Sequence, residues 1–556
     1  MMTDKRLDLE YLLQSDIIGK LIPSIGKEQW QPLYVSGDSQ PDRFGLFCAL
    51  LTEAAATQAL EHDGWDIMIG EGLPGFSQGW SGGKKQTTYH RFGGSGGVRP
   101  LVVYREFHGA YPSYVEVCEE FRHYHNLAED PNRRVLLDFD RSGYEIEVAR
   151  IGPKQVDAKL RYLKEFQAGT GLYLGIYIDS VRYSNLSIDD IPKDLHEVVH
   201  TEKQLRYLRN VSKTGHFGEK YSTFSRLLVT VVMPPPPQEG AGIWPYEAND
   251  QDNEVSFVTG VNDSGYNVEH TSNPAKLGNY FGANPGASHY LTPIYFRKEV
   301  LTKYYADPDR YTVSDGNLSC LGLWGCRIDN DHSAHVVVFL GDLGRDLPYE
   351  ERLHWKQFNV PPEGGVSETN FKRSFLAQWA APKAPDLVFR QEYAHLSKAW
   401  EKSQGWPLFL RAEAGDAHLI ETVRVPVTNS QSELDEQILT LTKLVVDSLN
   451  EKELASRGGA GAPGDKGITK LEMFLKGTGF AQATSVTQFL RDLQALRSSG
   501  SGHRKGERYA TIVAALGADL RRKPEIMSRL LEEATAALGA LGLHHCPDYR
   551  TVGSGG

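Results

Sequence analysis

Four consecutive prolines, Pro234 to Pro237, interrupt the chain and are followed by Gln-Glu-Gly-Ala-Gly. Proline has no amide hydrogen and a fixed φ, so this run fits neither a helix interior nor a central strand. We therefore expect a domain boundary here, with residues 234–242 as a linker between two folded regions.

The chain has 556 residues, which is more than one hydrophobic core normally serves. Its 40% hydrophobic and 24% charged residues are typical of folded proteins. We expect an α+β multidomain protein, with mixed N-terminal and central domains followed by an all-α bundle. The expected bounds are 1–233, 243–429 and 430–546, with a tail at 547–556 that ends in a vector-derived Gly/Ser scar.

Local patterns in the first two regions predict both strands and helices. Alternating apolar residues or short apolar runs predict strands, and spacing of three to four predicts helices. Asp140-Arg141-Ser142-Gly143 is typical of a hairpin turn. The expected strands are 65–69, 98–104, 134–138, 144–151, 172–178 and 336–340, and the expected helices are 156–166, 297–305, 368–379 and 391–402.

The pattern changes near Asn429, after which apolar residues recur at helical spacing in five stretches. Each stripe requires a partner, so the five helices predict a bundle. The stripes are Leu434 to Val445, Ile468 to Leu475, Val486 to Leu496, Tyr509 to Leu520 and Ile526 to Leu541, with a loop at 458–467 after the first.

The composition of the sequence limits the cellular compartment and the kinds of binding partner that we expect. The sequence contains no apolar run long enough for a membrane helix and no signal-peptide core near its start, so we expect a cytoplasmic protein without a membrane partner. Five scattered cysteines predict reduced, mostly buried thiols. The net charge of −11 excludes a protein that coats nucleic acid over its whole surface, but it leaves room for a local basic site.

Such a site occurs between Arg491 and Arg529, where nine Lys and Arg residues stand against four acids. Its centre reads Leu496-Arg497-Ser498-Ser499-Gly500-Ser501-Gly502-His503-Arg504-Lys505-Gly506. Small residues let backbone amides approach a phosphate, arginine binds it bidentately, and histidine transfers protons near neutral pH.

An arginine followed after a few residues by a histidine, within a helical bundle of this size, resembles the HEPN superfamily of ribonucleases. These domains occur in bacterial toxins, CRISPR-associated ribonucleases and abortive-infection defence proteins. The resemblance covers residues 430–546. It implies a metal-independent endoribonuclease without a cofactor, in a bacterial antiphage protein whose large front domains sense a phage-derived trigger.

The same resemblance implies roles for individual residues. Arg497 and His503 become the catalytic pair that cleaves RNA by transesterification. Ser498, Ser501, Arg504, Lys505 and Arg508 become contacts to the RNA. Because each family site is completed by a partner, a homodimer or higher homo-oligomer is implied. The alternative interpretation of the segment is a solvated loop in which Arg497 caps a helix.

Two further interpretations belong to other classes of protein. One is a non-catalytic recognition or oligomerisation protein. The other is a metal-dependent nuclease with a site near 329–346, where Asp329, Asp331, His332 and His335 flank an expected strand and Asp342 and Asp346 follow it. The competing interpretation of these acids is a polar turn.

Two N-terminal patterns predict ordinary structure more strongly than chemistry. Gly70-Glu71-Gly72-Leu73-Pro74-Gly75 lacks the Lys-Ser/Thr of a phosphate loop, and with the Gly79 to Gly83 run it predicts a long surface loop. Basic and aromatic residues alternate at 104–109 and 121–125, which would suit stacking on nucleotides, but their helical spacing favours a core role for the aromatics.

Overall fold

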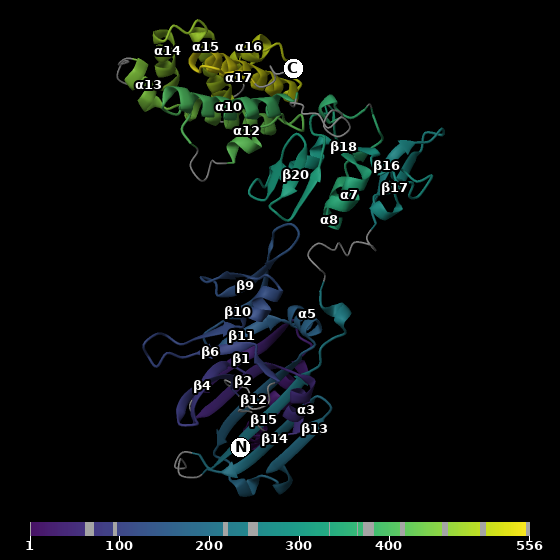
Figure 1. Cartoon of the computed structure of the whole chain (residues 1–556), viewed down its shortest axis with the longest axis vertical. Coiled ribbons are helices and arrows are strands. Elements are labelled where there is room, and N and C mark those ends of the chain that lie inside the picture. The colour runs from purple at the N-terminus through teal and green to yellow at the C-terminus, as the bar shows by residue number, and fades with distance from the viewer. Residues whose placement is uncertain are drawn as a thin grey trace. The chain divides into compact units, whose positions relative to one another are not determined.

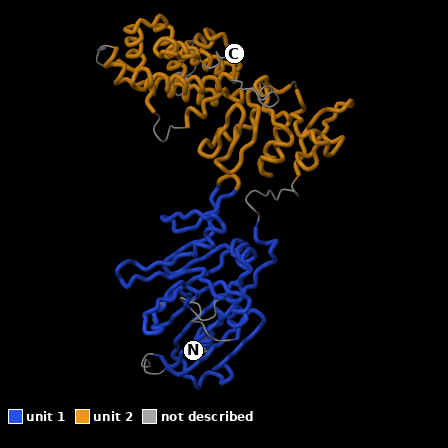
Figure 2. Tube along the Cα trace, viewed as in Figure 1, with its two compact units in different colours: residues 1–140, 144–248 blue, residues 141–143, 249–556 orange. Residues whose placement is uncertain are grey.

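The computed structural model describes residues 2–39, 41–61, 72–92, 97–214, 221–242, 254–332, 334–363, 365–370, 383–411, 418–458, 465–500 and 507–551. The chain divides into two compact units (Figure 2). The first comprises residues 1–140 and 144–248, and the second comprises 141–143 and 249–556. The chain is of mixed α and β structure, with a helical C-terminal region (Figure 1).

In the first unit the described residues form one antiparallel sheet of eleven strands. Its order is β13-β14-β15-β12-β2-β1-β11-β10-β9-β8, and β5 pairs with β2. The strands are β1 Trp30–Ser39, β2 Asp42–Leu51, β5 Val98–Pro100, β8 Ala128–Asp130, β9 Val135–Phe139, β10 Glu145–Ile151, β11 Gln155–Lys159, β12 Tyr173–Ser184, β13 Glu197–Glu202, β14 Leu205–Lys213 and β15 Thr223–Met233.

Strand β12 lies at the centre because its apolar run suits burial on both faces. Leu174, Ile176 and Ile178 are buried on one face and Tyr177 on the other, and β12 pairs along its length with β2 on one side and β15 on the other. Its edge counterparts are polar and short. The predicted strand at 172–178 is therefore confirmed, as is the predicted hairpin, which is β9 and β10.

Helices and two separate hairpins complete the first unit. The hairpins are β3 with β4 and β6 with β7. The elements are α1 Met2–Leu12, η1 Ile17–Leu21, α2 Ile22–Ser24, α3 Glu53–Glu61, β3 Pro74–Ser81, β4 Lys84–Arg91, β6 Val102–Arg105, β7 Tyr114–Val117, α4 Glu119–Tyr124, α5 Leu160–Thr170, η3 Ile188–Asp190, η4 Lys193–Leu195 and η5 Gln238–Gly240.

Two predictions in this unit were correct only in part, and a third was wrong. The helix expected at 156–166 is β11 followed by α5, because Val156 and Ala158 alternate into the core while β11 pairs with β1 and β10. The strand expected at 98–104 is split between β5 and β6, which belong to different sheets. The loop expected around Gly79–Gly83 is the β3–β4 hairpin. The strand expected at 65–69 lies outside the described residues.

The second unit begins with three small antiparallel sheets around their own core. The elements are β16 Ser256–Val261, β17 Asn267–Thr271, η7 Pro274–Lys276, β18 Pro293–Arg297, η8 Lys298–Leu301, α6 Thr302–Tyr305, β19 Tyr311–Val313, β20 Asn317–Cys320, β21 Trp324–Arg327, β22 His335–Phe339, α7 Leu340–Asp346, α8 Tyr349–Lys356 and β23 Asn359–Val360. The strand expected at 336–340 is β22, and the helix expected at 297–305 is η8 and α6. Of the helix expected at 368–379, residues 371–379 lie outside the description.

The rest of the unit is helical and shares one hydrophobic core. The helices are α10 Pro385–Gln404, α11 Leu419–Thr422, α12 Gln431–Thr442, η10 Lys443–Asp447, α13 Glu451–Gly458, α14 Gly467–Gly477, α15 Ala483–Gly500, α16 Glu507–Ala515 and α17 Lys523–His545. The five predicted bundle helices are confirmed as α12, α14, α15, α16 and α17, whereas α13 was not predicted.

The bundle core extends beyond the five predicted helices. Phe389, Leu396 and Trp400 of α10 are buried in it, and α10 packs along α17. After α17, near the C-terminus, buried Tyr549 donates a hydrogen bond of 2.9 Å to Glu392 Oε1 of α10. The bundle core therefore draws on residues on both sides of 430–546. All five cysteines are free thiols, and all but Cys118 are buried, as expected.

Candidate nucleic-acid interface

Helix α15 carries the arginine of the predicted site. Its apolar side chains recur at helical spacing, and the bundle core buries Val486, Leu490, Leu493 and Leu496. Arg497 follows in the last turn, on the flank of this stripe, and 34% of its side chain is exposed. The stripe that buries α15 therefore leaves Arg497 at the surface.

The Arg497 guanidinium is held by a carboxylate at the end of η10. Because η10 continues α12 without a break, we call the two together the helical column. Arg497 Nη1 donates to Asp447 Oδ2 at 2.6 Å, and Asp447 is the last residue of η10. Both side chains are more than one third exposed, so the pair contributes at most about 1 kcal/mol to stability. An incoming phosphate can replace this carboxylate at little cost to the fold.

Ser498 and Arg508 are the other predicted site residues that the structure describes. The Ser498 hydroxyl donates to the Gln494 carbonyl at 2.9 Å, which leaves its lone pairs as acceptors at the exposed helix end. Arg508 is exposed in the first turn of α16. Ser501, His503, Arg504 and Lys505 lie outside the described residues, so the convergence of Arg497 with His503 stays a prediction.

Several described cations near this region have no described acid within ion-pair distance. Arg491 pairs with Glu472 and Arg529 with Glu532, but no ion pair joins a described acid to the exposed Arg508, Arg521 and Arg522 or to the partly exposed Lys523. The described part of the segment therefore keeps a net positive surface, as the sequence predicted.

Contacts to α12 show where these cations lie within the bundle. Asn429 joins the α16–α17 connection, because its side chain accepts from Lys523 N and donates to Arg521 O, both at 2.7 Å. Tyr509, next to Arg508, contacts Gln431 at the start of α12. Arg497 instead contacts the end of η10, about 25 Å further along the helical column. A ligand that reaches both groups must be an extended one.

The acidic cluster of the alternative prediction lies in the small-sheet region. Asp329 follows β21 and bridges to Val337 of β22, with bonds of 2.7 and 3.1 Å between their backbones. Its carboxylate accepts from both the amide and the hydroxyl of Ser367, each at 2.7 Å. Burial raises the pKa of Asp329, and the two bonds from Ser367 oppose that rise.

The remaining acids of this cluster also have structural partners. Asp331 accepts from Thr369 Oγ1 at 2.6 Å and from the amides of Lys383 and Ala384 at 2.8 and 2.6 Å, just before α10 begins. Asp342 accepts from the Tyr290 hydroxyl at 3.0 Å and pairs with Arg345. Asp331 therefore fixes the backbone before α10, and Asp342 is held by the Tyr290 and Arg345 side chains.

Two basic groups beside the cluster are shifted toward their neutral forms. Burial lowers the pKa of Lys298, although the nearby carboxylates of Asp386, Asp331 and Asp329 oppose this. Burial likewise lowers the pKa of His332, whose ring lies 5.6 Å from that of His335. The surroundings are therefore poorly hydrated, with opposite charges that compensate one another.

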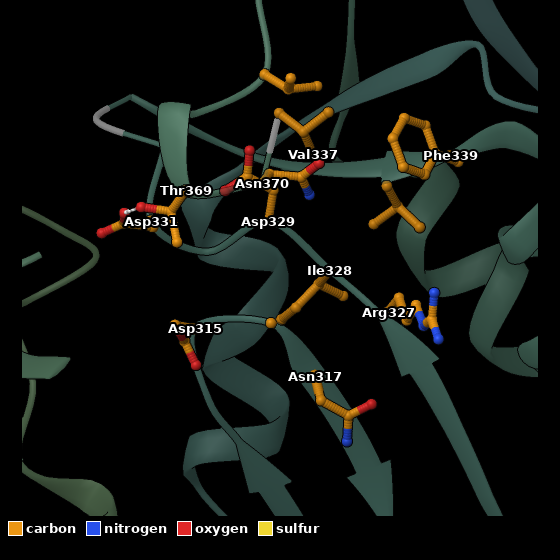
Figure 3. Close-up of a pocket in the computed structure, with 13 residues that line it drawn as sticks. Asp315, Asn317, Arg327, Ile328, Asp329, Asp331, Val337, Phe339, Thr369 and Asn370 are labelled. Atoms are coloured by element: carbon orange, nitrogen blue, oxygen red, sulfur yellow. Dashed lines mark hydrogen bonds between the residues drawn. The ribbon is translucent and has the colours of Figure 1, made fainter. Parts of the chain in front are cut away.

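A cavity of about 370 Å³ lies against this cluster (Figure 3). Asp329, Asp331, Thr369 and Asn370 line one part of it, and Asn317 and Arg327 line another. Within the described ranges, no group of three His, Cys, Asp or Glu side chains is arranged to hold a metal ion.

The sequence pattern of Asp329 and Asp331 indicated this turn but not the cavity. Thr369 and Asn370 come from a segment distant along the chain, and only the fold brings them beside Asp331. A second feature was also missed, the β3–β4 hairpin with its exposed aromatic residues. The Gly82-Gly83 pair, which is typical of a two-residue hairpin turn, was the available signal, but the other glycines beside it favoured a loop.

Comparisons with known proteins do not indicate a function for this chain. No protein family model, no curated protein and no solved structure matches it. Among the helices that the structure describes, none combines the length and the hydropathy needed to cross a bilayer.

Proposed function

We propose that the C-terminal helical bundle is a metal-independent endoribonuclease of HEPN type, active as a homodimer, in a bacterial antiphage or toxin-type protein. The observation that carries the proposal is the position of Arg497, one third exposed in the last turn of α15, whose apolar face the bundle core buries. The cations of α16 and the α16–α17 connection, which pair with no described acid, support it, because they suit a polyanion. The upstream regions then serve as sensors of a phage-derived trigger.

The reaction follows from the chemistry of the two catalytic residues. His503 accepts the proton of an RNA 2′-hydroxyl, and the 2′-oxygen attacks the adjacent phosphorus. Arg497 stabilises the extra negative charge of the phosphorane. The bond to the 5′-oxygen then breaks, and that oxygen takes a proton. The products are a 2′,3′-cyclic phosphate and a 5′-hydroxyl, without oxidation, reduction or a metal ion.

The neighbouring residues bind the strand in this proposal. Ser498, Ser501, Arg504 and Lys505 contact the phosphates beside the cleaved bond. Arg508, near the start of α12, contacts the strand further along. Asp447 holds the Arg497 guanidinium until a phosphate displaces it.

Cleavage of end-labelled RNA by the purified full-length protein, with and without EDTA, tests the proposal. Cleavage that persists in EDTA, yields a cyclic phosphate and falls by about 100-fold or more in His503→Ala supports it. Arg497→Ala is expected to lose a comparable factor. Arg491→Ala is the matched control, because Arg491 lies on the same helix and is ion-paired with Glu472. His544→Ala controls for loss of an exposed histidine.

The other outcomes would contradict the site assignment or indicate a different class of protein. If Arg497→Ala cleaves like the wild type, the site assignment is wrong. Cleavage that EDTA abolishes indicates a metal-dependent nuclease. Absence of cleavage with every trigger tested indicates a recognition or oligomerisation protein.

A further inference from the structure

The β3–β4 hairpin stands outside the large sheet of the first unit and pairs only within itself among the described residues. Its turn is fixed by Gly82 and Gly83, with φ of 58° and 78°. Two successive positive φ angles give the tight turn whose twist suits a two-residue hairpin. The register that follows pairs Phe76 with Tyr89 and Trp80 with Lys85.

This register gathers the aromatic side chains on one face. Residues that pair directly across two strands project to the same side, and alternate residues along a strand share it. We call this side the aromatic face. It consists of Pro74, Phe76, Gln78, Trp80, Lys85, Thr87, Tyr89 and Arg91. The other face carries Gly75, Gly79 and polar residues, among them Ser77, Thr88 and Gln86, and the ring of Phe92, which follows β4, packs there over Gly75 and against His90.

The aromatic face is open to solvent. The exposed fractions are 63% for Phe76, 71% for Tyr89 and 76% for Trp80. A two-stranded hairpin gains little stability from such side chains, because they bury almost no area. Their exposure therefore indicates a binding surface rather than a core.

The positive charge of the hairpin indicates which class of molecule it binds. Residues 72–92 contain no Asp or Glu, whereas they contain Lys84, Lys85 and Arg91, in a chain whose net charge is −11. Arg91 also donates to the Gly72 carbonyl at 2.7 Å, which holds its guanidinium at the base of the hairpin. Aromatic rings combined with unopposed cations suit a strand with unpaired bases and phosphates.

The spacing on the face suits the same partner. Trp80 lies four residues from Phe76, which is about 13 Å along the strand. The Gln78–Thr87 pair lies between them and offers hydrogen bonds to base edges or to a 2′-hydroxyl. A strand laid along the hairpin can therefore stack a base at each end and hydrogen-bond between them.

We propose that the aromatic face of the β3–β4 hairpin binds single-stranded RNA. The choice of RNA over single-stranded DNA rests on the ribonuclease function proposed above. Stacking by Trp80 and by the Phe76–Tyr89 pair supplies most of the affinity, and Lys85 and Arg91 neutralise phosphates. The hairpin thus captures RNA in the N-terminal unit, separately from the cleavage chemistry of the bundle.

Fluorescence anisotropy with a 15-nucleotide, 2′-fluoro, single-stranded oligonucleotide tests this in the full-length protein. The oligonucleotide lacks the nucleophilic hydroxyl, so binding is measured without cleavage. Trp80→Ala is expected to weaken binding by about tenfold or more, and Phe76→Ala with Tyr89→Ala by at least as much. Lys85→Ala is expected to reduce the salt slope by about 0.7.

Two variants are matched controls that should bind like the wild type. Gln86→Ala alters the opposite face of the same hairpin, and Tyr266→Ala removes an equally exposed aromatic ring, 72% accessible, from the other unit. Ultraviolet crosslinking followed by peptide mapping gives a local readout. A crosslinked peptide within 72–92 is expected, in addition to any from the bundle site proposed above, and it should be lost in Trp80→Ala.

Wild-type affinity in both aromatic variants would overturn the inference, as would crosslinks confined to other peptides. Sedimentation would identify a different occupant, because an aromatic-face variant that becomes monomeric with unchanged RNA affinity shows that a second copy covers the face. If the 2′-fluoro oligonucleotide binds through the aromatic face but the end-labelled RNA of the cleavage assay is never cut, the proposed ribonuclease is refuted and this inference stands. If the wild type cleaves RNA but Trp80→Ala binds the oligonucleotide as tightly as the wild type, this inference is refuted and the proposed ribonuclease stands.

Discussion

His545, the last residue of α17, provides a quantitative test of the packing of the bundle. Its ring is 8% exposed and lies 4.9 Å from Trp400, 5.6 Å from Phe474 and 5.8 Å from Phe480, measured between ring centroids. Its Nε2 has no hydrogen-bond partner within the described part of the chain. Burial, with a smaller contribution from His544, lowers the pKa of His545 from 6.5 to about 4.

This lowered pKa makes the stability of the bundle dependent on pH. Between pH 6.5 and 4 the unfolded chain binds a proton at His545 that the folded chain does not, so acid favours unfolding. The contribution of His545 to stability is complete above pH 6.5 and declines as the pH falls toward 4. With these two pKa values, about 2 kcal/mol of the free energy of unfolding is lost between pH 7 and pH 5.

Hydrogen-exchange mass spectrometry of the intact protein measures this loss in peptides from α17 and α10. After correction for intrinsic exchange, protection is expected to fall about 30-fold from pH 7 to pH 5. His545→Phe keeps a ring among the aromatic neighbours and removes the titration, so most of that pH dependence should disappear. His395→Gln, which replaces an exposed histidine of α10, should retain it. If His545→Phe loses as much protection as the wild type, the ring titrates normally and the reasoning is refuted.

Two further substitutions test individual contacts. Gly344→Ala in α7 would drive a methyl group into the Ser272 carbonyl, so chemical denaturation should show a loss of about 3 kcal/mol or more; Gly477→Ala, which has open space at the corresponding position, should show none. Asp447→Asn releases Arg497 from its exposed ion pair, so unfolding free energy should change by less than about 1 kcal/mol while RNA binds more tightly in anisotropy measurements. Unchanged RNA affinity in Asp447→Asn would argue against a phosphate-binding role for Arg497.

Helices could be predicted best where the apolar period was long and regular. The stripe from Val486 to Leu496 specifies α15 because a period of 3.6 residues buries one face and no other regular structure does so. The helix predicted at 156–166 was wrong over its first four residues, because Val156 and Ala158 fit a strand once β1 and β10 lie beside them, and it was correct over 160–166, which lie in α5. Short segments take the structure that their neighbours in space impose.

The candidate site shows the same division. The excess of cations between Arg491 and Arg529 was evident from composition, and the described cations do lie at the surface. The partner of Arg497 could not be predicted, since Asp447 is 50 residues away and meets it only through helix packing. The acids at 329–346 could be recognised as a cluster in the sequence. Their roles depend on Ser367, Thr369 and Tyr290, which lie elsewhere in the sequence and meet these acids only in the fold.

The sequence by itself determined a chain of mixed α and β structure, a C-terminal bundle and a basic segment within it, because local period and local charge need no distant partner. Only the tertiary structure decided that α10 joins the bundle, that the acids near Asp329 hold backbone segments, and that glycine-rich residues 74–91 form a hairpin with an aromatic face. Burial, ion pairing and strand register are properties of pairs of residues, and the pairs are set by the fold.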